Sequence, residues 1–458
     1  MAMRFLNLFA AALLLATTPA IAAPKRAPAK IAKPAARPAV AASLPNTPEA
    51  QELRRAFRFA FPIYEIMRTR SVQLARAESA GLPNAVNFIL PKLTLADASS
   101  RDVTTPNNDT LYGSAWLDLA AGPVILNVPA LPGRYNSAAL MSVQTDNTAI
   151  IGTRTGGRAG RYAITGPGYT GPIPLGTERI ESASNDAWLL IRVLVNGPKD
   201  LEAAARALDG FSIATTADRP LAIRTLAAPA NPDAKTFLAV VNQALARSAA
   251  NPDLTARAAN FTTLAANPNL WAKYLPALRA ELKSGLTSAG TTIDGWSYPD
   301  PAIGEFGDND DLRSYVALGG LGALPRVEAM YLTARNDKSG AVLDGSRAYT
   351  VKLPANIPVA AFWSLTMYQQ EPDGRLFFVA NSLNRFAIGD RSRHLRAERD
   401  GSYDIFVQAT QPEGERVVNW LPAPKGKFVL VFRAYLPRAP LLDGSFHLPP
   451  IEQSEVIP

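Results

Sequence analysis

The stretch Thr105-Pro106-Asn107-Asn108-Asp109-Thr110-Leu111-Tyr112 and a second stretch, Asn419-Trp420-Leu421-Pro422-Ala423-Pro424, lie far apart in a chain of 458 residues. Both combine amides, aromatic rings and prolines, and short polar residues and prolines of this kind favour turns. Each borders an apolar run that is typical of a strand. The two stretches therefore indicate turn-bounded β structure in both the N-terminal and the C-terminal parts of the chain.

The first strand-rich region is predicted over residues 47–197. A helix is expected to begin at Pro48-Glu49, because apolar residues from Leu53 to Ile63 recur at helical spacing, and Pro62 is expected to kink or divide it. Strands are predicted where alternating or β-branched runs are separated by Gly and Pro, at 123–128, 133–143, 149–153, 160–165 and 187–195. This pattern is typical of an antiparallel β domain.

The middle of the chain, residues 198–343, has a helical pattern. Helices are predicted at Asp200–Leu208, Asp233–Arg247, Leu270–Leu286 and Asp311–Arg335. A second β domain is predicted over 344–458, with strands near 349–353, 359–368, 403–408 and 428–435. The predicted fold class is α+β, mainly β, with two antiparallel sandwich-like or jelly-roll-like modules joined by a helical segment.

The N-terminus has the pattern of a secretory signal peptide over residues 1–22. Arg4 precedes the unbroken apolar run Leu8–Ala16, and Ala20-Ile21-Ala22 supplies small residues for cleavage. Nine apolar residues are too few to span a bilayer, which needs about 20, and no later run is long enough. We expect cleavage after Ala22, no transmembrane segment, and a periplasmic or secreted protein.

Residues 23–46 are expected to form an extended linker, because they are rich in Ala and Pro. The linker carries five cations and no acid. The whole chain is formally +8; removing Arg4 leaves +7, and removing the five linker cations leaves +2 for residues 47–458. The nearly neutral body argues against nucleic-acid binding. The basic linker fits weak contact with the cell envelope or a solvated spacer.

The chain contains no cysteine and two histidines, His394 and His447. The absence of cysteine excludes disulfides, thiolate metal sites and a cysteine nucleophile. A zinc site would need carboxylates to complete it, so no metal and no cofactor are predicted. The stretch Gly166–Gly171 matches the glycine-rich motif of dinucleotide-binding proteins. That motif requires a helix to begin directly after it, but Pro172-Ile173-Pro174 follows here, so a turn is predicted. The run Asp308–Asp311 is predicted to cap a helix.

Several motifs occur together in this order along the chain. In the N-terminal part, roughly 59–195, they are Thr105–Tyr112, Ala115–Leu119, Gly133-Arg134-Tyr135 and Gly152-Thr153-Arg154. In the C-terminal part, roughly 344–449, they are Asp344–Arg347, Phe362–Tyr368, Asn384–Gly389, Asn419–Pro424 and Leu442-Asp443-Gly444. The chain thereby resembles bacterial proteins that pair domain-of-unknown-function family 1254 with domain-of-unknown-function family 1214. The resemblance implies two β-rich domains joined by helices, an Asn in many relatives at the position of Leu324, and no established reaction.

Two groups of residues are candidates for a ligand site. The first comprises polar and aromatic side chains of the N-terminal domain: Asn107, Asn108, Asp109, Tyr112, Trp116, Arg134 and Tyr135. The arginine offers a planar fork to a carboxylate, and the aromatic rings can stack on sugar or ring faces. The second group comprises Asn384, Arg385, Asn419 and Trp420. Turn closure in the first group and a buried structural network in the second explain the same residue types without a ligand.

Three functions remain open at this stage. The first is binding of a small carboxylated or sugar-like molecule. The second is a histidine-independent periplasmic hydrolase or lyase with Asp109 as acid or base, for which Asp118 and Asp146 are the expected partner carboxylates. The third is a structural or interaction protein of the cell envelope. The sequence does not decide whether the protein is an enzyme. Binding ranks slightly first, because no catalytic constellation is visible.

Overall fold

A computed structural model of the protein describes residues 44–101, 104–216, 225–285, 290–371, 374–393 and 395–456. The predicted signal peptide, most of the linker at 23–46 and His394 lie outside these described residues. The described residues belong to one compact unit.

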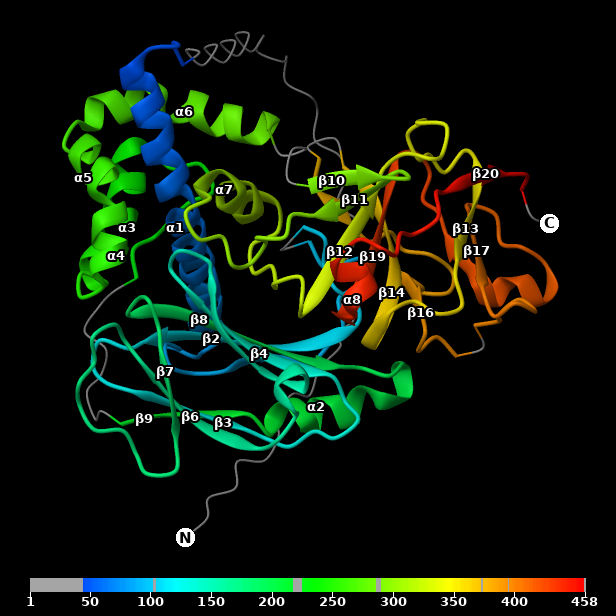
Figure 1. Cartoon of the computed structure of the whole chain (residues 1–458), viewed down its shortest axis with the longest axis horizontal. Coiled ribbons are helices and arrows are strands. Elements are labelled where there is room, and N and C mark those ends of the chain that lie inside the picture. The colour runs from blue at the N-terminus through cyan, green and yellow to red at the C-terminus, as the bar shows by residue number, and fades with distance from the viewer. Residues whose placement is uncertain are drawn as a thin grey trace, which may run out of the picture. The chain divides into compact units, whose positions relative to one another are not determined.

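The N-terminal region contains two packed sheets (Figure 1). The main one, which we call the N-terminal main sheet, is antiparallel with the order β1 (Leu90–Lys92), β2 (Thr110–Asp118), β8 (Asp186–Leu194), β4 (Asn136–Ser142) and β5 (Asn147–Gly152). The other has the order β7 (Glu178–Glu181), β6 (Gly160–Thr165), β3 (Val124–Val128) and β9 (Ser212–Thr215), and only its β6–β7 pair is parallel. The five strands predicted here are confirmed in type and position.

Side chains of the N-terminal main sheet alternate between its two faces, as the pleat of a strand requires. Leu111, Ala115 and Leu117 of β2 lie in the core shared with the smaller sheet. Trp116 of the same strand lies on the opposite face, in the core shared with the helices. Further along this second face, Tyr135 lies in a cluster with residues of the C-terminal module. The second face is therefore covered partly by helices and partly by the other module.

The helices gather mainly around α1 (Figure 1). Their bounds are α1 Pro48–Ser79, α2 Leu201–Asp209, α3 Ala234–Arg247, α4 Pro252–Arg257, α5 Ala259–Ala265, α6 Pro268–Ser284, α7 Asp310–Gly319 and α8 Ala439–Leu442. The predicted helices that start at Asp200, Asp233 and Leu270 correspond to α2, α3 and α6. Aromatic packing joins three of them, since the ring of Phe237 on α3 lies 5.9 Å from that of Phe57 on α1 and 5.6 Å from that of Trp271 on α6.

Helix α1 continues through Pro62, so this proline does not divide the helix, and the predicted kink stays a prediction. A proline inside a helix removes one backbone hydrogen bond and crowds the preceding turn. Here Pro62 and its neighbours Phe61 and Ile63 are all buried. Tertiary packing supplies most of the stability of helices in proteins, and burial on this scale offsets the lost hydrogen bond.

The C-terminal module also has two packed sheets. The C-terminal main sheet has the order β10 (Gly290–Ile293), β11 (Trp296–Pro299), β12 (Ala329–Ala334), β19 (Phe428–Pro437), β14 (Val359–Gln370) and β15 (Leu376–Phe377), and β16 (Ala387–Gly389) also pairs with β14. The smaller sheet has the order β18 (Trp420–Pro422), β17 (Tyr403–Gln408), β13 (Ala348–Leu353) and β20 (Glu452–Ser454), with a parallel β17–β18 pair.

The predicted helix at Asp311–Arg335 is correct only in its first part. Helix α7 ends at Gly319, and β12 begins at Ala329. Gly320, Gly322 and Pro325 lie between them and stop the helix, because glycine and proline terminate helices. The cap predicted at Asp308–Asp311 is present, since the Asn309 side chain accepts a hydrogen bond from the backbone N–H of Leu312.

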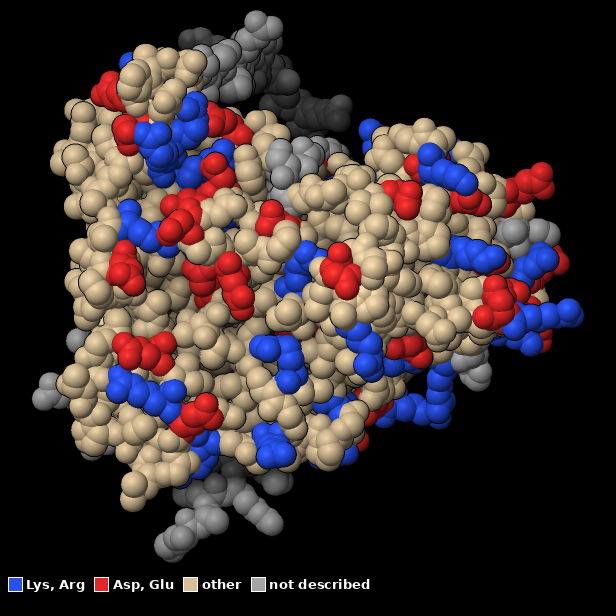
Figure 2. All heavy atoms as spheres, in the orientation of Figure 1, with Lys and Arg blue, Asp and Glu red and all other residues tan. Residues whose placement is uncertain are grey.

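The fold is α+β and mainly β, with several largely antiparallel sheets, as predicted. Jelly-roll connectivity and the proposed domain boundaries stay predictions. Among the described residues, no helix is long and apolar enough to cross a membrane. Acidic and basic side chains are interspersed over the face shown in Figure 2, which fits the nearly neutral charge calculated for residues 47–458.

Candidate functional site: an arginine–tyrosine cluster between the main sheets

Each main sheet places an arginine beside a tyrosine on the face that meets the other module. On the N-terminal main sheet, Tyr112 of β2 is the cross-strand partner of Arg192 of β8. On the C-terminal main sheet, Tyr331 of β12 is the partner of Arg433 of β19. We call these four residues, together with Tyr435, the arginine–tyrosine cluster. Directly paired residues of antiparallel strands lie close enough for their side chains to interact.

The cluster bridges the two modules. The phenols of Tyr331 and Tyr435, from the C-terminal module, act electrostatically on Arg192 of the N-terminal module. The ring of Tyr435 also lies 5.1 Å from that of Tyr135, edge to face. Tyr112 and Tyr331 remain partly exposed, whereas both arginines are buried. The cluster is therefore an inter-module site whose two outer tyrosines reach solvent.

Arg192 is buried without a charged partner among the described residues. Its side chain is 5% exposed. Nη2 donates a hydrogen bond to the Gly322 carbonyl at 3.0 Å, and the guanidinium lies 5.7 Å from the centroid of the Tyr112 ring. Its Nη1 is buried and has no hydrogen-bond partner within the described chain. A buried, unpaired donor on a cation is costly, so an acceptor supplied by a bound molecule would be stabilising there.

Arg433 is held more firmly than Arg192. Its Nη1 donates to the Thr366 hydroxyl at 2.6 Å, and its Nη2 donates to the hydroxyl of Tyr368. Both acceptors lie on β14, the strand beside β19. The Asp109 carboxylate acts on Arg433 electrostatically without forming an ion pair with it. Arg433 thus contributes positive charge to the cluster in a fixed position.

Three tyrosines at the site, Tyr331, Tyr368 and Tyr435, stay protonated at physiological pH. Burial raises the pKa of Tyr368 to about 12, raises the pKa of Tyr435 well above its ordinary value and raises the pKa of Tyr331. Desolvation disfavours the phenolate, which explains all three shifts. Neutral phenols can donate hydrogen bonds, so the cluster presents two guanidinium groups among hydroxyl donors. That composition favours an anionic ligand.

Asp109 joins the two modules next to this cluster. Its Oδ2 accepts a hydrogen bond from the Ser364 hydroxyl at 2.7 Å, and its Oδ1 accepts from Arg391 Nη2 at 2.8 Å. The Nε of Arg391 also lies 3.5 Å from Oδ1 of Asp390. Burial raises the pKa of Asp390 to about 6. Arg391 therefore stands between two carboxylates in different environments.

The other residues of the motif around Asp109 also serve this junction. The Asn107 amide donates to the Tyr435 hydroxyl at 2.8 Å, and its carbonyl oxygen accepts from the backbone N–H of Asp109 at 2.7 Å, closing the predicted Asx turn. The Asn108 amide donates to the backbone carbonyl of Ala96. Asn107 and Asp109 thus combine turn closure with contacts to the C-terminal module, while Asn108 fixes a neighbouring loop.

The structure separates Trp116 and Arg134 from the arginine–tyrosine cluster. Trp116 stacks on Trp188 at 5.0 Å and donates through Nε1 to the side-chain oxygen of Gln73 on helix α1. Arg134 forms a two-pronged ion pair with Asp200, with distances of 2.6 and 2.7 Å. The Arg134 guanidinium, predicted from the sequence to contact a ligand, is therefore already paired with the Asp200 carboxylate.

Tyr135 lies at the inter-module contact. Its hydroxyl donates to the fully buried Glu328 at 2.7 Å. The ring also packs 5.5 Å from Phe362. Leu324, at the position where the family resemblance implies an amide in many relatives, is fully buried in this same apolar cluster.

The second predicted group forms a local network in the C-terminal module. Arg385 donates through Nη1 to the carbonyls of Val417 and Trp420, both at 2.7 Å. The Asn419 amide donates to Arg396 and Asp404 carbonyls, and the Trp420 indole donates to the Gln408 carbonyl. Asn384 lies in an exposed turn with a positive φ of 48°. These contacts fix the 3₁₀ helix Gly414–Asn419 and the strand after it, and none of them reaches the arginine–tyrosine cluster.

The sequence analysis missed Arg192, Arg433, Tyr331 and Tyr435. A signal was present for the two arginines, because each interrupts a strand whose other residues are almost all apolar, Asp186–Leu194 and Phe428–Pro437. Long charged side chains are almost never fully buried unless they are paired. A lone arginine in a central strand therefore indicates a functional or structural polar site.

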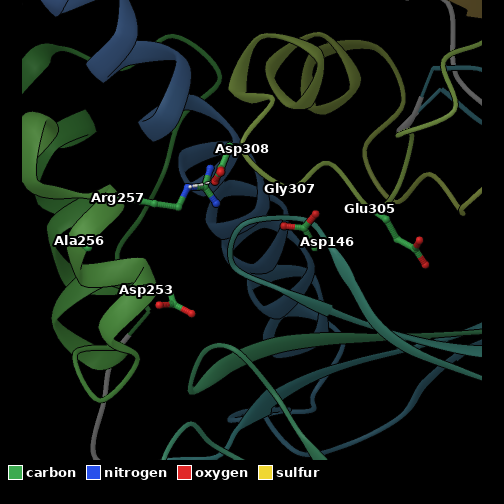
Figure 3. Close-up of a pocket in the computed structure, with 7 residues that line it drawn as sticks. All are labelled: Asp146, Asp253, Ala256, Arg257, Glu305, Gly307 and Asp308. Atoms are coloured by element: carbon green, nitrogen blue, oxygen red, sulfur yellow. Dashed lines mark ion pairs between the residues drawn. The ribbon is translucent and has the colours of Figure 1, made fainter.

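A separate open hollow of about 720 Å³ lies between α4, the β4–β5 turn and the loop before α7 (Figure 3). Its charged lining residues are Asp146, Asp253, Arg257, Glu305 and Asp308. Arg257 forms ion pairs with Asp308 and Asp310 at 3.3 and 2.6 Å. The described residues contain no group of three or more His, Cys, Asp or Glu side chains suited to a metal.

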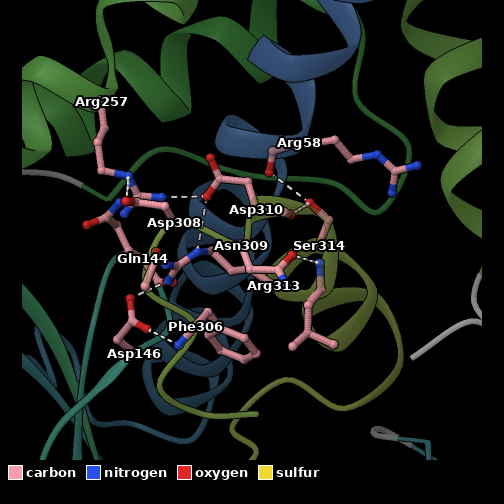
Figure 4. Close-up of polar contacts among 12 residues, drawn as sticks. Arg58, Gln144, Asp146, Arg257, Phe306, Asp308, Asn309, Asp310, Arg313 and Ser314 are labelled. Carbon is pink, nitrogen blue, oxygen red and sulfur yellow. Dashed lines mark hydrogen bonds and ion pairs between the residues drawn. The ribbon is translucent and has the colours of Figure 1, made fainter. Parts of the chain in front are cut away.

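A structural junction shares Asp146 and Gly307 with this hollow (Figure 4). Arg313 is 1% exposed and contacts Asp146, Asp310 and the carbonyls of Gln144 and Gly307. Asp146 also accepts from the backbone N–H of Phe306 at 2.7 Å. These contacts fasten the start of α7 to the turn after β4. Asp146 is therefore committed to this junction, whereas Asp109 is held by Ser364 and Arg391.

The fold and site together define a two-module protein with a polar site where its two main sheets meet. Residues 86–215 match the family model described as "Protein of unknown function (DUF1254)", and residues 328–439 match "Protein of unknown function (DUF1214)". The chain belongs to the proteins that pair these two domains, which confirms the resemblance found in its motifs.

Two solved structures are similar to the chain. The VPA0106 protein from Vibrio parahaemolyticus is 24% identical, with 88% of this chain and 99% of that chain covered and a TM-score of 0.68. A putative uncharacterized protein from Burkholderia cenocepacia is 12% identical, with 90% and 91% covered and a TM-score of 0.44. The first likeness shows the shared fold alone. No curated protein matches the chain.

Proposed function

We propose that this protein binds a small polar ligand through a carboxylate, at the arginine–tyrosine cluster between the two modules. The observation that carries the proposal is the buried Nη1 of Arg192, which has no acceptor among the described residues. A carboxylate would fill that position and pair with the guanidinium in a charge-assisted hydrogen bond. The partly exposed Tyr112 and Tyr331 rings would contact the body of the ligand, which can be an organic acid or a sugar acid.

Arg192→Met tests this proposal in a thermal-shift screen with carboxylic acids, sugar acids and the matching uncharged sugars. In the unmodified protein, a carboxylate at 100 times its Kd should stabilise the folded state by about 2.7 kcal/mol. In Arg192→Met that stabilisation should disappear. The melting temperature without ligand should change by only a few degrees, because the variant loses one hydrogen bond and also relieves a buried charge. Arg192→Lys should retain a weakened response, since lysine lacks the fork.

Arg134→Met is the matched control, because it changes another partly buried arginine of the same module that is already paired with Asp200. It should lower the melting temperature yet leave the ligand response intact. A full ligand response in Arg192→Met, or equal responses to a sugar acid and its uncharged sugar, would contradict the proposal.

A second candidate function, that of a hydrolase or lyase that uses carboxylate acid–base chemistry, is favoured by one observation. Asp390 has a pKa raised to about 6 and shares Arg391 with Asp109. Two carboxylates whose environments differ in this way can divide the roles of acid and base. Asp390 takes the place of Asp118 and Asp146 as the partner carboxylate. Turnover of nitrophenyl glycosides or esters that Asp109→Asn and Asp390→Asn each abolish would support this function, and no turnover by the unmodified protein would eliminate it for these substrates.

We further propose that the protein is exported to the periplasm or beyond. The support is the apolar run Leu8–Ala16 followed by Ala20-Ile21-Ala22. N-terminal sequencing of the protein from a periplasmic fraction should begin at Ala23. Recovery of intact Met1 from that fraction would refute cleavage.

A further inference from the structure

A second, smaller hollow lies among the helices, away from the arginine–tyrosine cluster. It has a volume of about 190 Å³. Its lining comes from three helices and the segment before α3, and the residues that matter are Phe61, Asn231, Arg279, Leu282, Lys283 and Leu318. The walls are thus apolar and the polar groups are two cations and one amide. Among the described residues, none that lines the hollow is acidic.

Arg279 of α6 is the central polar group of this hollow. Its Nη2 donates to the Ala230 carbonyl at 2.5 Å, and its guanidinium lies 5.8 Å from the centroid of the Phe61 ring. Its Nη1 is buried and has no hydrogen-bond partner within the described chain. Glu65 acts on it only at a distance, and burial lowers its pKa, as expected for a cation that lacks a close counter-charge.

We infer that this hollow is a second binding site, specific for a small aromatic or branched monocarboxylate of about the size of benzoate. The carboxylate would pair with the Arg279 guanidinium, which lines the hollow, with Lys283 adding positive charge at the exposed side. The apolar body would lie against Phe61, Leu282 and Leu318. The size fits, because an apolar cavity of about 150 Å³ accommodates benzene, and this hollow is slightly larger. The site does not depend on the function proposed for Arg192.

The experiment titrates the mature protein with 4-fluorobenzoate and, separately, with 4-fluorobenzyl alcohol, followed by fluorine NMR. The acid should bind with 1:1 saturation at this site, and the alcohol should bind at least tenfold more weakly because it lacks the charge. Arg279→Gln should weaken binding of the acid by about tenfold or more. Leu318→Trp should abolish binding by filling the hollow while Arg279 stays in place.

Two control variants separate this site from others. Lys273→Gln removes an exposed cation from the same helix and should bind the acid normally. Arg192→Met removes any acid bound at the arginine–tyrosine cluster, so the fluorine signal that Leu318→Trp abolishes should persist in it; loss of that same signal in Arg192→Met would assign it to the cluster instead. Unchanged affinity in Arg279→Gln, equal binding of the alcohol, or no binding by the unmodified protein would each overturn the inference. If Arg279→Gln unfolds, Leu318→Trp alone decides.

Discussion

At the scale of single residues, Asp390 gives the protein a predictable pH dependence. Its folded pKa is about 6, raised mainly by burial, against an ordinary value of 3.8. The folded state therefore binds this proton more tightly than the unfolded state does. Its contribution destabilises the protein above pH 6, and that penalty is relieved as the pH falls from 6 toward 4. Because 31% of the side chain is exposed, solvent moderates the effect.

Asp390→Asn should raise the melting temperature at pH 8 and have little effect near pH 4. The asparagine keeps an acceptor for the Trp363 backbone N–H, which donates to Asp390 at 3.3 Å. The quantity to measure is the difference in melting temperature between variant and parent from pH 4 to pH 8, because other groups titrate equally in both. A difference that does not grow with pH would show that Asp390 has an ordinary pKa in the folded protein.

The residue scale also shows which parts of the site a sequence can predict. The Asx turn at Asn107 follows from local chemistry, and the structure contains it. The partners of Asp109, Ser364 and Arg391, lie more than 250 positions away along the chain, and no local pattern encodes that meeting. Arg134 illustrates the converse, because its guanidinium is already paired with Asp200, which lies 66 positions further along the chain.

At the scale of secondary-structure elements, a buried ion network joins the helices to the N-terminal main sheet. Asp186 of β8 and Asp118 of β2 are cross-strand partners, so two carboxylates stand side by side. Arg247 of α3 lies 2.7 Å from each of them, and Arg70 of α1 pairs with Asp186. All four side chains are at least nine-tenths buried. Asp118 is thereby part of an architectural network and not a partner of Asp109.

Asp186→Asn should destabilise the protein by about 3–5 kcal/mol, because removing one member of a buried ion pair strands the other charges. Arg70 loses its counter-charge in this variant. The matched control is Glu202→Gln, which breaks an exposed pair with Arg206 on α2 and should cost about 0.5 kcal/mol or less. Urea unfolding of both variants measures the difference. Similar losses for the two would mean that the network contributes no more than a surface pair.

Element boundaries explain most of the remaining differences between prediction and structure. Long, strongly patterned strands such as Tyr403–Gln408 are predicted to the residue. The segment 311–335 is predicted as one helix because its apolar residues continue past Gly319. In the structure, β12 is a strand because it pairs with β19, which lies about 100 residues further along the chain. Short strands of two to four residues, such as β15 and β16, exist only because a longer strand lies beside them.

At the scale of the whole molecule, the two modules are joined by buried charge as well as by apolar contact. Glu328, just before β12, is fully buried and accepts from Tyr135 and from Arg154 of the N-terminal module, both at 2.7 Å. The apolar cluster of Tyr135, Phe362 and Tyr435 surrounds this junction. The proposed ligand site lies at the same boundary, so ligand binding and module contact are expected to stabilise each other.

Arg154→Gln should destabilise the protein by about 2 kcal/mol or more, although the arginine itself is 37% exposed. The cost arises at Glu328, whose carboxylate would remain buried without its cation. Glu328→Gln removes the stranded charge, so the double variant should be no less stable than Arg154→Gln alone.

Unfolding followed by tryptophan fluorescence and by circular dichroism should remain a single coincident transition in every variant, because the interface is buried on both sides. Additive losses would show that the two side chains act independently, and a split transition would show that the modules unfold separately once this junction is weakened.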